Sequence, residues 1–266
     1  MMTPLMEKPE RSADTTDEAS LAKYFEQHVA EGKQGLRYLL KRPRDGFQAF
    51  LAMSRLPRLV ARTSDRDAES IAVRDGLVRP PVRWRSPIHE VTSVIVLPSS
   101  PEEYAQGASK QTLRRKARAA TRAGVRWVKV DDLEERRRLL QIASEHERSA
   151  ALAEYRTADP DNTHLLGVRL WLAAYAADDE PLLLSVTPVD GEWAVLRYFR
   201  SISNREEAST SRYLMTQILV EHLVAVGAKY LADPWSPVNL PAGLRHFQRM
   251  VGFRLVRVRL ERAGRS

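Results

Sequence analysis

Apolar residues recur every three to four positions near the N-terminus, a spacing typical of amphipathic helices. The repeat extends over residues 20–60 and is formed by Leu21, Tyr24, Phe25, Val29, Leu36, Leu39, Leu40, Phe47, Phe50, Leu51 and Met53. Because Pro43 and Gly46 interrupt this repeat, it predicts several short helices. Their apolar faces would either cover a sheet or form the surface of a homodimer.

Two polar segments border the helical region. Residues 1–20 are rich in Thr, Asp and Glu, which predicts a mobile tail. Residues 62–85 are charged and irregular, and Pro80-Pro81 within them indicate a domain boundary. We therefore expect a helical N-terminal extension and linker at 21–85 and a separate domain at 86–266.

Beyond this boundary the pattern alternates between β-branched runs and helical repeats. Strands are predicted at 91–97, 125–130, 181–188, 193–200, 228–233 and 253–260. Helices are predicted from Pro101 onward and at 109–123, 131–149, 167–177, 209–226 and 242–250. Asp190-Gly191 is a strong signal for a tight hairpin. The order predicts an α/β fold with a mixed sheet and flanking helices.

The composition narrows the class of protein. The chain has 266 residues, of which 43% are hydrophobic and 29% charged, as in ordinary globular proteins. It contains no cysteine, which excludes disulfides, zinc–thiolate sites, iron–sulfur clusters and a thiol nucleophile. No uncharged apolar run reaches the length of about 18 residues that a membrane span needs, and residues 1–20 do not resemble a signal peptide. We expect a cytoplasmic location.

The positive charge is concentrated in one segment. The net charge is +8, and the window between Glu103 and Asp131 contains eight basic and no acidic residues. The rest of the chain therefore has no net charge. A basic stripe on a neutral protein indicates a polyanionic partner.

Helical geometry sorts this segment into two faces. At about 100° per residue, Leu113, Ala117, Ala120 and Gly124 share one narrow face. Arginines occupy the opposite half, where their guanidinium groups suit phosphate oxygens. The candidate phosphate- or RNA-binding residues are Lys110, Arg114, Arg115, Arg118 and Arg122. The alternative is a solvated charged face without a ligand, at the cost of self-repulsion.

Two runs of the sequence resemble a known superfamily. The run at 91–130 (VTSVIVLPSSPEEYAQGASKQTLRRKARAATRAGVRWVKV) resembles the Fem-type aminoacyl transferases and their GNAT-like relatives, in which a strand, a short helix, a basic helix and another strand follow one another. The runs at 210–235 and 243–260 are similar to the closing part of a GNAT domain, with Phe247 and Gly252-Phe253 matching its end.

The resemblance implies a GNAT-like fold and N-acyl transfer from an activated donor, aminoacyl-tRNA or acyl-CoA, to an amine. It implies no tightly bound cofactor, since such domains act mainly by positioning two substrates. The glycine-bearing pyrophosphate loop of the acyl-CoA members is missing, because no glycine lies between Glu192 and Val226. The lysine that Fem-type enzymes carry beside the late aromatic residue is also missing, since Gln248 follows Phe247. The equivalent turn offers Ser209, Thr210, Ser211 and Arg212 as candidate donor-binding residues. The missing glycine loop favours a Fem-like donor, whereas the missing lysine is a departure from the Fem-type pattern.

Two residues are candidates for catalysis. Asp233 ends a predicted strand, where α/β sheets place functional groups, and its carboxylate would orient or deprotonate an ammonium. Its alternative role is to open the turn at Pro234. Tyr198 would donate to a leaving oxygen or thiol, or else is a half-buried packing residue flanked by the outward-pointing Arg197 and Arg200.

The sequence lacks the motifs of metal sites, serine hydrolases and nucleotide-binding loops. The six histidines show no metal-ligand spacing, so no metal site is expected. The sequence has no G-x-S-x-G, P-loop or G-x-G-x-x-G motif. The leading hypothesis is an N-acyltransferase that uses a tRNA or CoA-type donor and an amine acceptor. The alternative is a non-catalytic GNAT-fold module that binds RNA or another polyanion.

Overall fold

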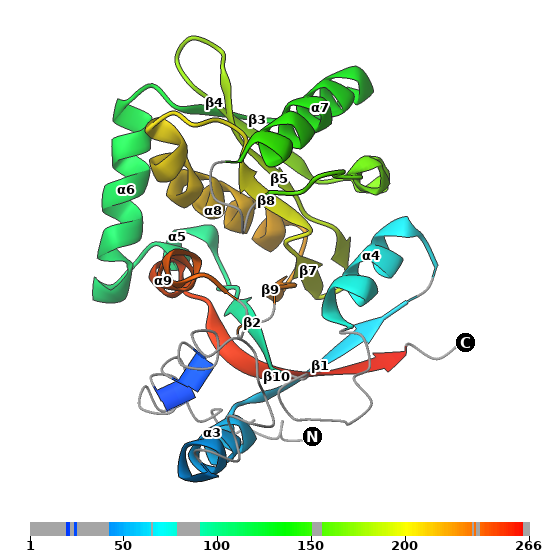
Figure 1. The fold of residues 1–266 in the computed structure, drawn as a ribbon, viewed down its shortest axis with the longest axis vertical. Coiled ribbons are helices and arrows are strands. Elements are labelled where there is room, and N and C mark those ends of the chain that lie inside the picture. The colour runs from blue at the N-terminus through cyan, green and yellow to red at the C-terminus, as the bar shows by residue number, and fades with distance from the viewer. Residues whose placement is uncertain are drawn as a thin grey trace, which may run out of the picture.

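The computed structural model describes residues 20–21, 24–25, 43–64, 66–78, 91–150, 156–235, 237 and 240–262. Its helices are α3 (Pro43–Arg55), α4 (Ala68–Leu77), α5 (Pro101–Tyr104), α6 (Gln111–Arg122), α7 (Leu133–Ser149), α8 (Glu207–Ala225) and α9 (Ala242–Val251), with short 3-10 turns η2 (Ala108–Lys110) and η4 (Thr163–Gly167). Its strands are β1 (Arg58–Thr63), β2 (Val91–Val96), β3 (Arg126–Lys129), β4 (Trp171–Tyr175), β5 (Pro181–Val186), β6 (Val189–Asp190), β7 (Trp193–Val195), β8 (Tyr198–Ser201), β9 (Tyr230–Asp233) and β10 (Arg254–Arg262). The predicted mixed α/β class with flanking helices is confirmed (Figure 1).

The larger sheet has six strands in the order β1-β10-β2-β9-β7-β6. Strands β1 and β10 are parallel, as are β7 and β9, whereas the other neighbours are antiparallel. Helix α4 covers one face through Val73 and Leu77, which pack with Leu59, Val195 and Val258. Gly76 of α4 lies so close to β7 that a Cβ there would be 2.6 Å from Val195 Cγ1.

The smaller sheet has four antiparallel strands in the order β3-β4-β5-β8. Leu172 and Ala174 of β4 belong to the core that α8 completes, whereas Trp171, Ala173 and Tyr175 belong to the core beneath α7. The sheet is therefore enclosed between α7 and α8 (Figure 1).

This enclosure explains one wrong prediction. The helix predicted at 167–177 is instead η4 and strand β4. All five residues of β4 are buried, because each face of the strand packs on a helix. A strand buried on both faces shows no polar alternation, and a short apolar run of this kind has no periodicity that separates strand from helix.

The segment between residues 58 and 78 also differs from its prediction. The helical repeat ends at Arg55, and residues 58–63 form β1 with alternating exposed and buried positions. The link predicted to be irregular contains α4, whose first turn is capped by Asp67 through a hydrogen bond from Ser70 N. Strand β1 thus joins part of the predicted N-terminal extension to the larger sheet. Leu36, Leu39, Leu40, Pro80-Pro81 and the tail at 1–19 lie outside the described residues.

Most other predicted elements are present. The hairpin signal at Asp190-Gly191 is confirmed, since β6 and β7 pair across this turn and Gly191 has φ +56°. The single return strand expected at 193–200 is divided, however. Its first part is β7 in the larger sheet, and its second part is β8 in the smaller sheet.

Candidate active site

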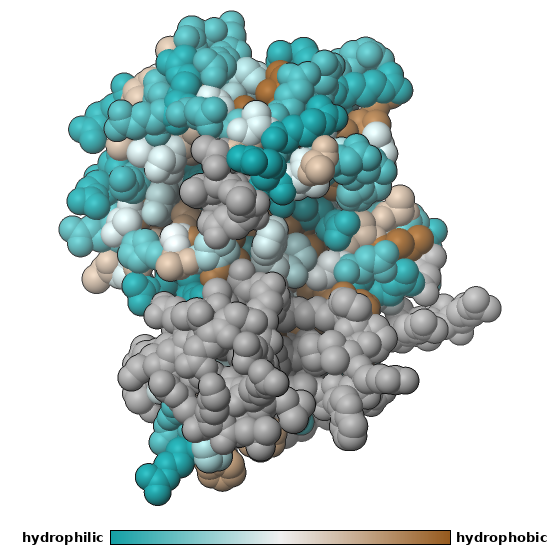
Figure 2. Space-filling view, viewed as in Figure 1, coloured by the Kyte–Doolittle hydropathy of each residue, from teal (hydrophilic) through white to brown (hydrophobic). Residues whose placement is uncertain are grey.

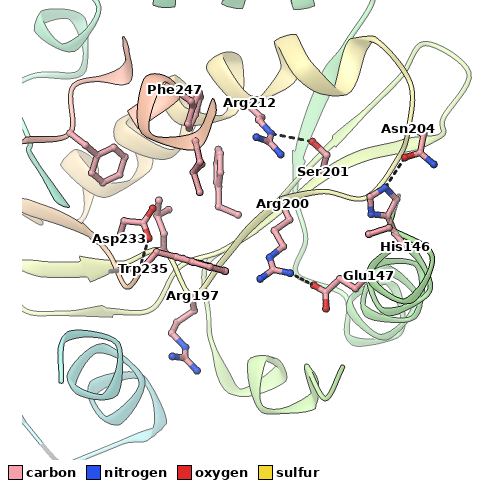
Figure 3. Close-up of a pocket in the computed structure, with 15 residues that line it drawn as sticks. His146, Glu147, Arg197, Arg200, Ser201, Asn204, Arg212, Asp233, Trp235 and Phe247 are labelled. Carbon is pink, nitrogen blue, oxygen red and sulfur yellow. Dashed lines mark hydrogen bonds and ion pairs between the residues drawn. The ribbon is translucent and has the colours of Figure 1, made fainter. Parts of the chain in front are cut away.

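The candidate active site is a cavity at the point where β7 and β8 separate. Val195 ends β7 beside β9, and Tyr198 begins β8 beside β5, so the chain crosses between the two sheets at Leu196 and Arg197. Leu196 N still donates to Ala232 O at 2.9 Å, which keeps the crossing close to β9. A cavity of about 270 Å³ opens where the sheets separate (Figure 3).

The floor of this cavity is apolar and aromatic. It is lined by Leu196, Phe199, Leu244, Phe247 and Phe253. The rings of Phe199 and Phe247 stack with centroids 6.2 Å apart, and Tyr213 meets the Phe247 ring edge-on at 5.1 Å. This packing fixes α9 against α8 and β8, so the floor is preformed.

Three arginines face the same cavity. Arg200 donates to Oε1 of Glu147 at 3.0 Å, and Arg212 Nε donates to Ser201 Oγ at 3.2 Å (Figure 3). Nη2 of Arg197 lies 3.2 Å from Nε2 of His164, while its Nε is buried with no hydrogen-bond partner in the described part of the chain. The arginines outnumber the two carboxylates at the cavity, Glu147 and Asp233, so the site suits an anionic ligand.

Asp233 lies at the carboxyl end of β9 and lines the cavity with only 6% of its surface exposed. Its Oδ1 accepts from Trp235 N at 2.8 Å, and its Oδ2 accepts from Gln248 Nε2 at 2.7 Å. The first bond is the turn-forming contact that the alternative interpretation expects. The contact with Trp235 forms the turn, and together with the contact from Gln248 it holds the Asp233 carboxylate against the cavity. The catalytic role of Asp233 stays a prediction.

Tyr198 does not line this cavity. Its hydroxyl donates to Glu147 Oε1 at 2.8 Å, beneath α7. Burial raises the pKa of Tyr198 well above its ordinary value, and the negative charge of Glu147 raises it further. Tyr198 acts on the cavity through Glu147, which also holds Arg200.

The predicted donor turn at the start of α8 brings only one residue to the cavity. Arg212 lines it, whereas Ser209 is exposed on the helix. The hydroxyls of Thr210 and Ser211 donate to the carbonyl oxygens of Glu207 and Ala208, at 3.0 and 2.9 Å. These hydroxyls are therefore occupied within the first turns of their own helix.

The basic helix α6 has the buried face that its sequence predicts. Leu113, Ala117 and Ala120 are buried, and α6 packs along α8. Gly124, the fourth residue of the predicted face, lies beyond the end of α6 and is exposed. Hydrophilic side chains cover the outer edge of the molecule at the position of α6 (Figure 2). None of its basic residues lines the cavity.

The five basic candidates divide into two groups. Lys110 donates to Val251 O and lies 4.2 Å from the centre of the Tyr104 ring, and Arg114 donates to Gly107 O at 2.8 Å, so both hold neighbouring backbone in place. The exposed side chains of Arg115, Arg118 and Arg122 have no hydrogen bond or ion pair with any described residue. These three, named here the α6 arginines, are available to a ligand.

Tyr213 connects the α6 arginines to the cavity. Burial raises the pKa of its hydroxyl, and the positive charges of Arg212 and Arg115 act against this rise. The Tyr213 ring in turn contacts Phe247 in the cavity floor. Positive charge therefore extends from α6 toward the cavity.

Several cavity residues were not identified from the sequence as functional. Arg197 and Arg200 were expected to point outward, yet both line the cavity. Glu147 carried no signal, because it is one of many charges in the charged helix α7. Trp235 gave only the general signal of a tryptophan after a strand end.

Two kinds of site are not found in the described part of the chain. Its His, Asp and Glu side chains form no group of three that would hold a metal ion. None of its helices combines the length and apolarity needed to cross a membrane.

No family model and no curated protein matches the sequence. Similar solved structures include FemX, at 12% identity and a TM-score of 0.48, over 63% of this chain and 60% of that chain. They also include the C-terminal DUF2156 domain of a protein assigned as a lysylphosphatidylglycerol synthetase from Agrobacterium fabrum, at 13% identity and a TM-score of 0.44, over 62% of this chain and 58% of that one. L-PGS from Bacillus licheniformis matches at 12% identity and a TM-score of 0.45, with the same coverage. The chain spans about three-fifths of the length of these structures. The neighbours thus include a protein of the Fem type that the sequence motifs resemble.

Proposed function

We propose that the protein is an N-acyltransferase that moves an aminoacyl group from aminoacyl-tRNA to an amine. The observation that carries this proposal is the cavity between β8 and β9, where a buried carboxylate and three arginines surround an aromatic floor. Such a site places a reactive carbonyl beside a proton acceptor and gives anionic parts of a donor several guanidinium partners.

The reaction needs positioning more than a nucleophile from the protein. The amine nitrogen of the acceptor attacks the ester carbonyl carbon of the donor, and a C–N bond forms as the C–O bond to the ribose breaks. Of the three protons on the acceptor ammonium, one stays on the amide, one leaves with the ribose oxygen and one is released. Asp233 accepts the first proton that leaves the ammonium, and holding both substrates together supplies much of the rate.

Aminoacyl-tRNA is favoured over acyl-CoA by the start of α8. Its first turn contains Glu207, and its Thr210 and Ser211 hydroxyls bond within the helix. A pyrophosphate would meet negative charge there and few unoccupied donors. The α6 arginines, by contrast, form an exposed basic row suited to the phosphates of a longer nucleic acid.

The experiment measures transfer and RNA binding with the same variants. Bulk tRNA aminoacylated with labelled amino acids is incubated with the protein and a mixture of amines, and the labelled amide is counted. We expect product from this donor and none from acetyl-CoA. Replacing the α6 arginines with alanine is expected to weaken tRNA binding and to lower the slope of log K against log salt by about one to three.

The matched control replaces Arg62, Arg137 and Arg259 with alanine. These arginines are exposed on other elements and form surface ion pairs that contribute little to stability. The control removes the same charge and is expected to bind tRNA as the unmodified protein does. Salt-dependent tRNA binding without product from either donor would support the non-catalytic RNA-binding module instead. Product from acetyl-CoA alone would reverse the choice of donor.

A further inference from the structure

A second cavity of about 470 Å³ adjoins the first on the side of η4. The two cavities share four lining residues, Glu147, Arg197, Arg200 and Trp235. The second cavity is completed by the segment at 157–165, which precedes and includes η4. These four side chains form the wall that the two cavities share.

The second cavity contains buried hydrogen-bond donors that have no partner. Nδ2 of Asn162 and Nε of Arg197 are both buried, and neither has an acceptor among the residues that the structure describes. Both residues line the second cavity. An unsatisfied buried donor is costly, so two of them in one cavity indicate that an acceptor-rich group binds there.

Positive and negative side chains both line the second cavity. The guanidinium groups of Arg197 and Arg200 lie at the wall shared with the first cavity, and Glu147 is occupied by Arg200 and Tyr198. The carboxylate of Asp161 accepts hydrogen bonds from Thr163 N and Thr163 Oγ1, at 3.0 and 2.6 Å, so it is engaged within its own loop. Asp159, the third carboxylate at this cavity, is exposed on the loop, so the two arginines favour an anion at the inner wall.

We propose that the second cavity binds an anionic group, a carboxylate or a phosphate, of the amine that accepts the acyl group. This inference rests on the proposed function, because it assigns the first cavity to the donor. The anion accepts hydrogen bonds from Asn162 Nδ2 and Arg197 Nε, and the amine extends along the shared wall toward Asp233. The acceptor is then an amine that carries its own negative charge, and an uncharged amine is a poor substitute.

The test compares amines that differ only in the anion. L-lysine is compared with cadaverine for the carboxylate, and phosphoethanolamine with ethanolamine for the phosphate. Binding to the unliganded protein is measured by calorimetry, and transfer from aminoacylated bulk tRNA is measured separately. We expect at least one anionic amine to bind about tenfold or more tightly than its neutral counterpart, since a site built for hydrogen bonds rejects an analogue that lacks the group. The pair that shows the preference identifies the anion.

Two substitutions locate the effect. Asn162→Asp keeps the side-chain shape but exchanges the amide donor for a charged acceptor, and Arg197→Lys keeps the charge but removes Nε. Each is expected to abolish the preference for the anionic amine. The KM for the aminoacylated tRNA is expected to stay unchanged in Asn162→Asp alone, because Arg197 also lines the first cavity. Gln141→Glu on α7 makes the same amide-to-carboxylate change on an exposed surface and is expected to leave the preference intact. Thermal unfolding of each variant checks that it is folded.

The outcomes separate this inference from the proposed function. Equal binding of both members of each pair, or a preference that survives Asn162→Asp, overturns the inference even if transfer occurs. A preference that Asn162→Asp removes, without transfer from any donor, supports the anion site and overturns the transferase proposal. A preference in both binding and transfer supports both.

Discussion

The hydroxyl of Tyr198 on β8 donates a 2.8 Å hydrogen bond to the buried Glu147 of α7, across 51 residues of sequence. The same carboxylate oxygen accepts from Arg200 at 3.0 Å. Since Arg200 lies in the wall between the two cavities, this pair joins the core beneath α7 to the candidate site. The orientation of Arg200 therefore depends on a contact that is itself out of reach of a ligand in the first cavity.

The hydrogen bond between Tyr198 and Glu147 predicts that the Tyr198→Phe variant is less stable than the unmodified protein. Because a hydrogen bond to a buried charged group is removed, the free energy of unfolding should fall by about 1.5–3 kcal/mol, measured by urea denaturation. Tyr175→Phe is the matched control, since its hydroxyl bonds to Glu135, whose side chain is 30% exposed. The control should lose less. Equal losses would show that the buried position of Glu147 is immaterial.

Asp233→Asn tests the assignment of the proton acceptor. The amide oxygen can still accept from Trp235 N, and Gln248 can rotate its own amide to keep the second contact. We expect the free energy of unfolding to change little and kcat to fall by about 10²–10⁴-fold, as for the loss of a general base. A stable variant with unchanged kcat would leave Asp233 as a turn residue alone.

Lys110 predicts a pH dependence of stability. Burial lowers the pKa of Lys110 to about 8 from the ordinary value of 10.5, and the nearby charge of Arg254 lowers it further. Between these two values the unfolded chain binds more protons than the folded chain, so stability should rise with pH in this range. This stabilisation is complete above pH 10.5 and absent below about pH 8.

The measurement compares the unfolding free energies of the unmodified protein and Lys110→Met from pH 7 to 11. The difference between the two curves isolates the lysine from other groups that titrate in this range. We expect the curve of the variant to lack the rise above pH 8. Parallel curves would mean that Lys110 keeps an ordinary pKa in the folded state.

The close approach of α4 to β7 predicts that Gly76→Ala destabilises the fold. The added Cβ would overlap Val195 Cγ1, and overpacking of this kind costs about 1–3 kcal/mol, which exceeds the gain of up to about 1 kcal/mol in helix propensity. Gly243→Ala in α9 is the control, because nothing lies within 4 Å of its added Cβ. It should be neutral or stabilising. A stabilised Gly76→Ala would mean that α4 can move away from the sheet.

The sequence predicted elements best where periodicity or β-branched residues gave a clear signal. Helices α6 and α7 and strand β10 appear close to their predicted positions, because their periodicity reflects one apolar face. Strand β2 is buried at five of its six positions and was predicted from its β-branched run VTSVIV. Strand β4 was predicted as a helix because both of its faces are buried. Strand β1 alternates as RLVART, but its charged outer residues and its distant partner gave no local sign that it belongs to a sheet.

The candidate site was predictable only at strand and helix ends. Asp233 and Arg212 were identified because each stands at such an end, and the structure brings both to one cavity. Glu147 and Asn162 could not be identified, because their importance comes from contacts with residues far away in sequence. Local patterns carry no information about which distant strand a helix will cover. The catalytic role of Asp233 and the RNA-binding role of the α6 arginines stay predictions.

The parallel pairing of β1 with β10 has a consequence for the order in which the protein assembles. Arg58 pairs with Arg257, about 200 residues later, and β10 separates β1 from β2 in the sheet. During synthesis β1 leaves the ribosome long before β10, its partner among the described strands, and β2 keeps an open edge until β10 arrives. Pairing over such a distance is slow, and open strand edges invite association between chains. A chain interrupted before β10 would therefore be prone to aggregate, and the nascent protein is a natural client for chaperones until its last strand is made.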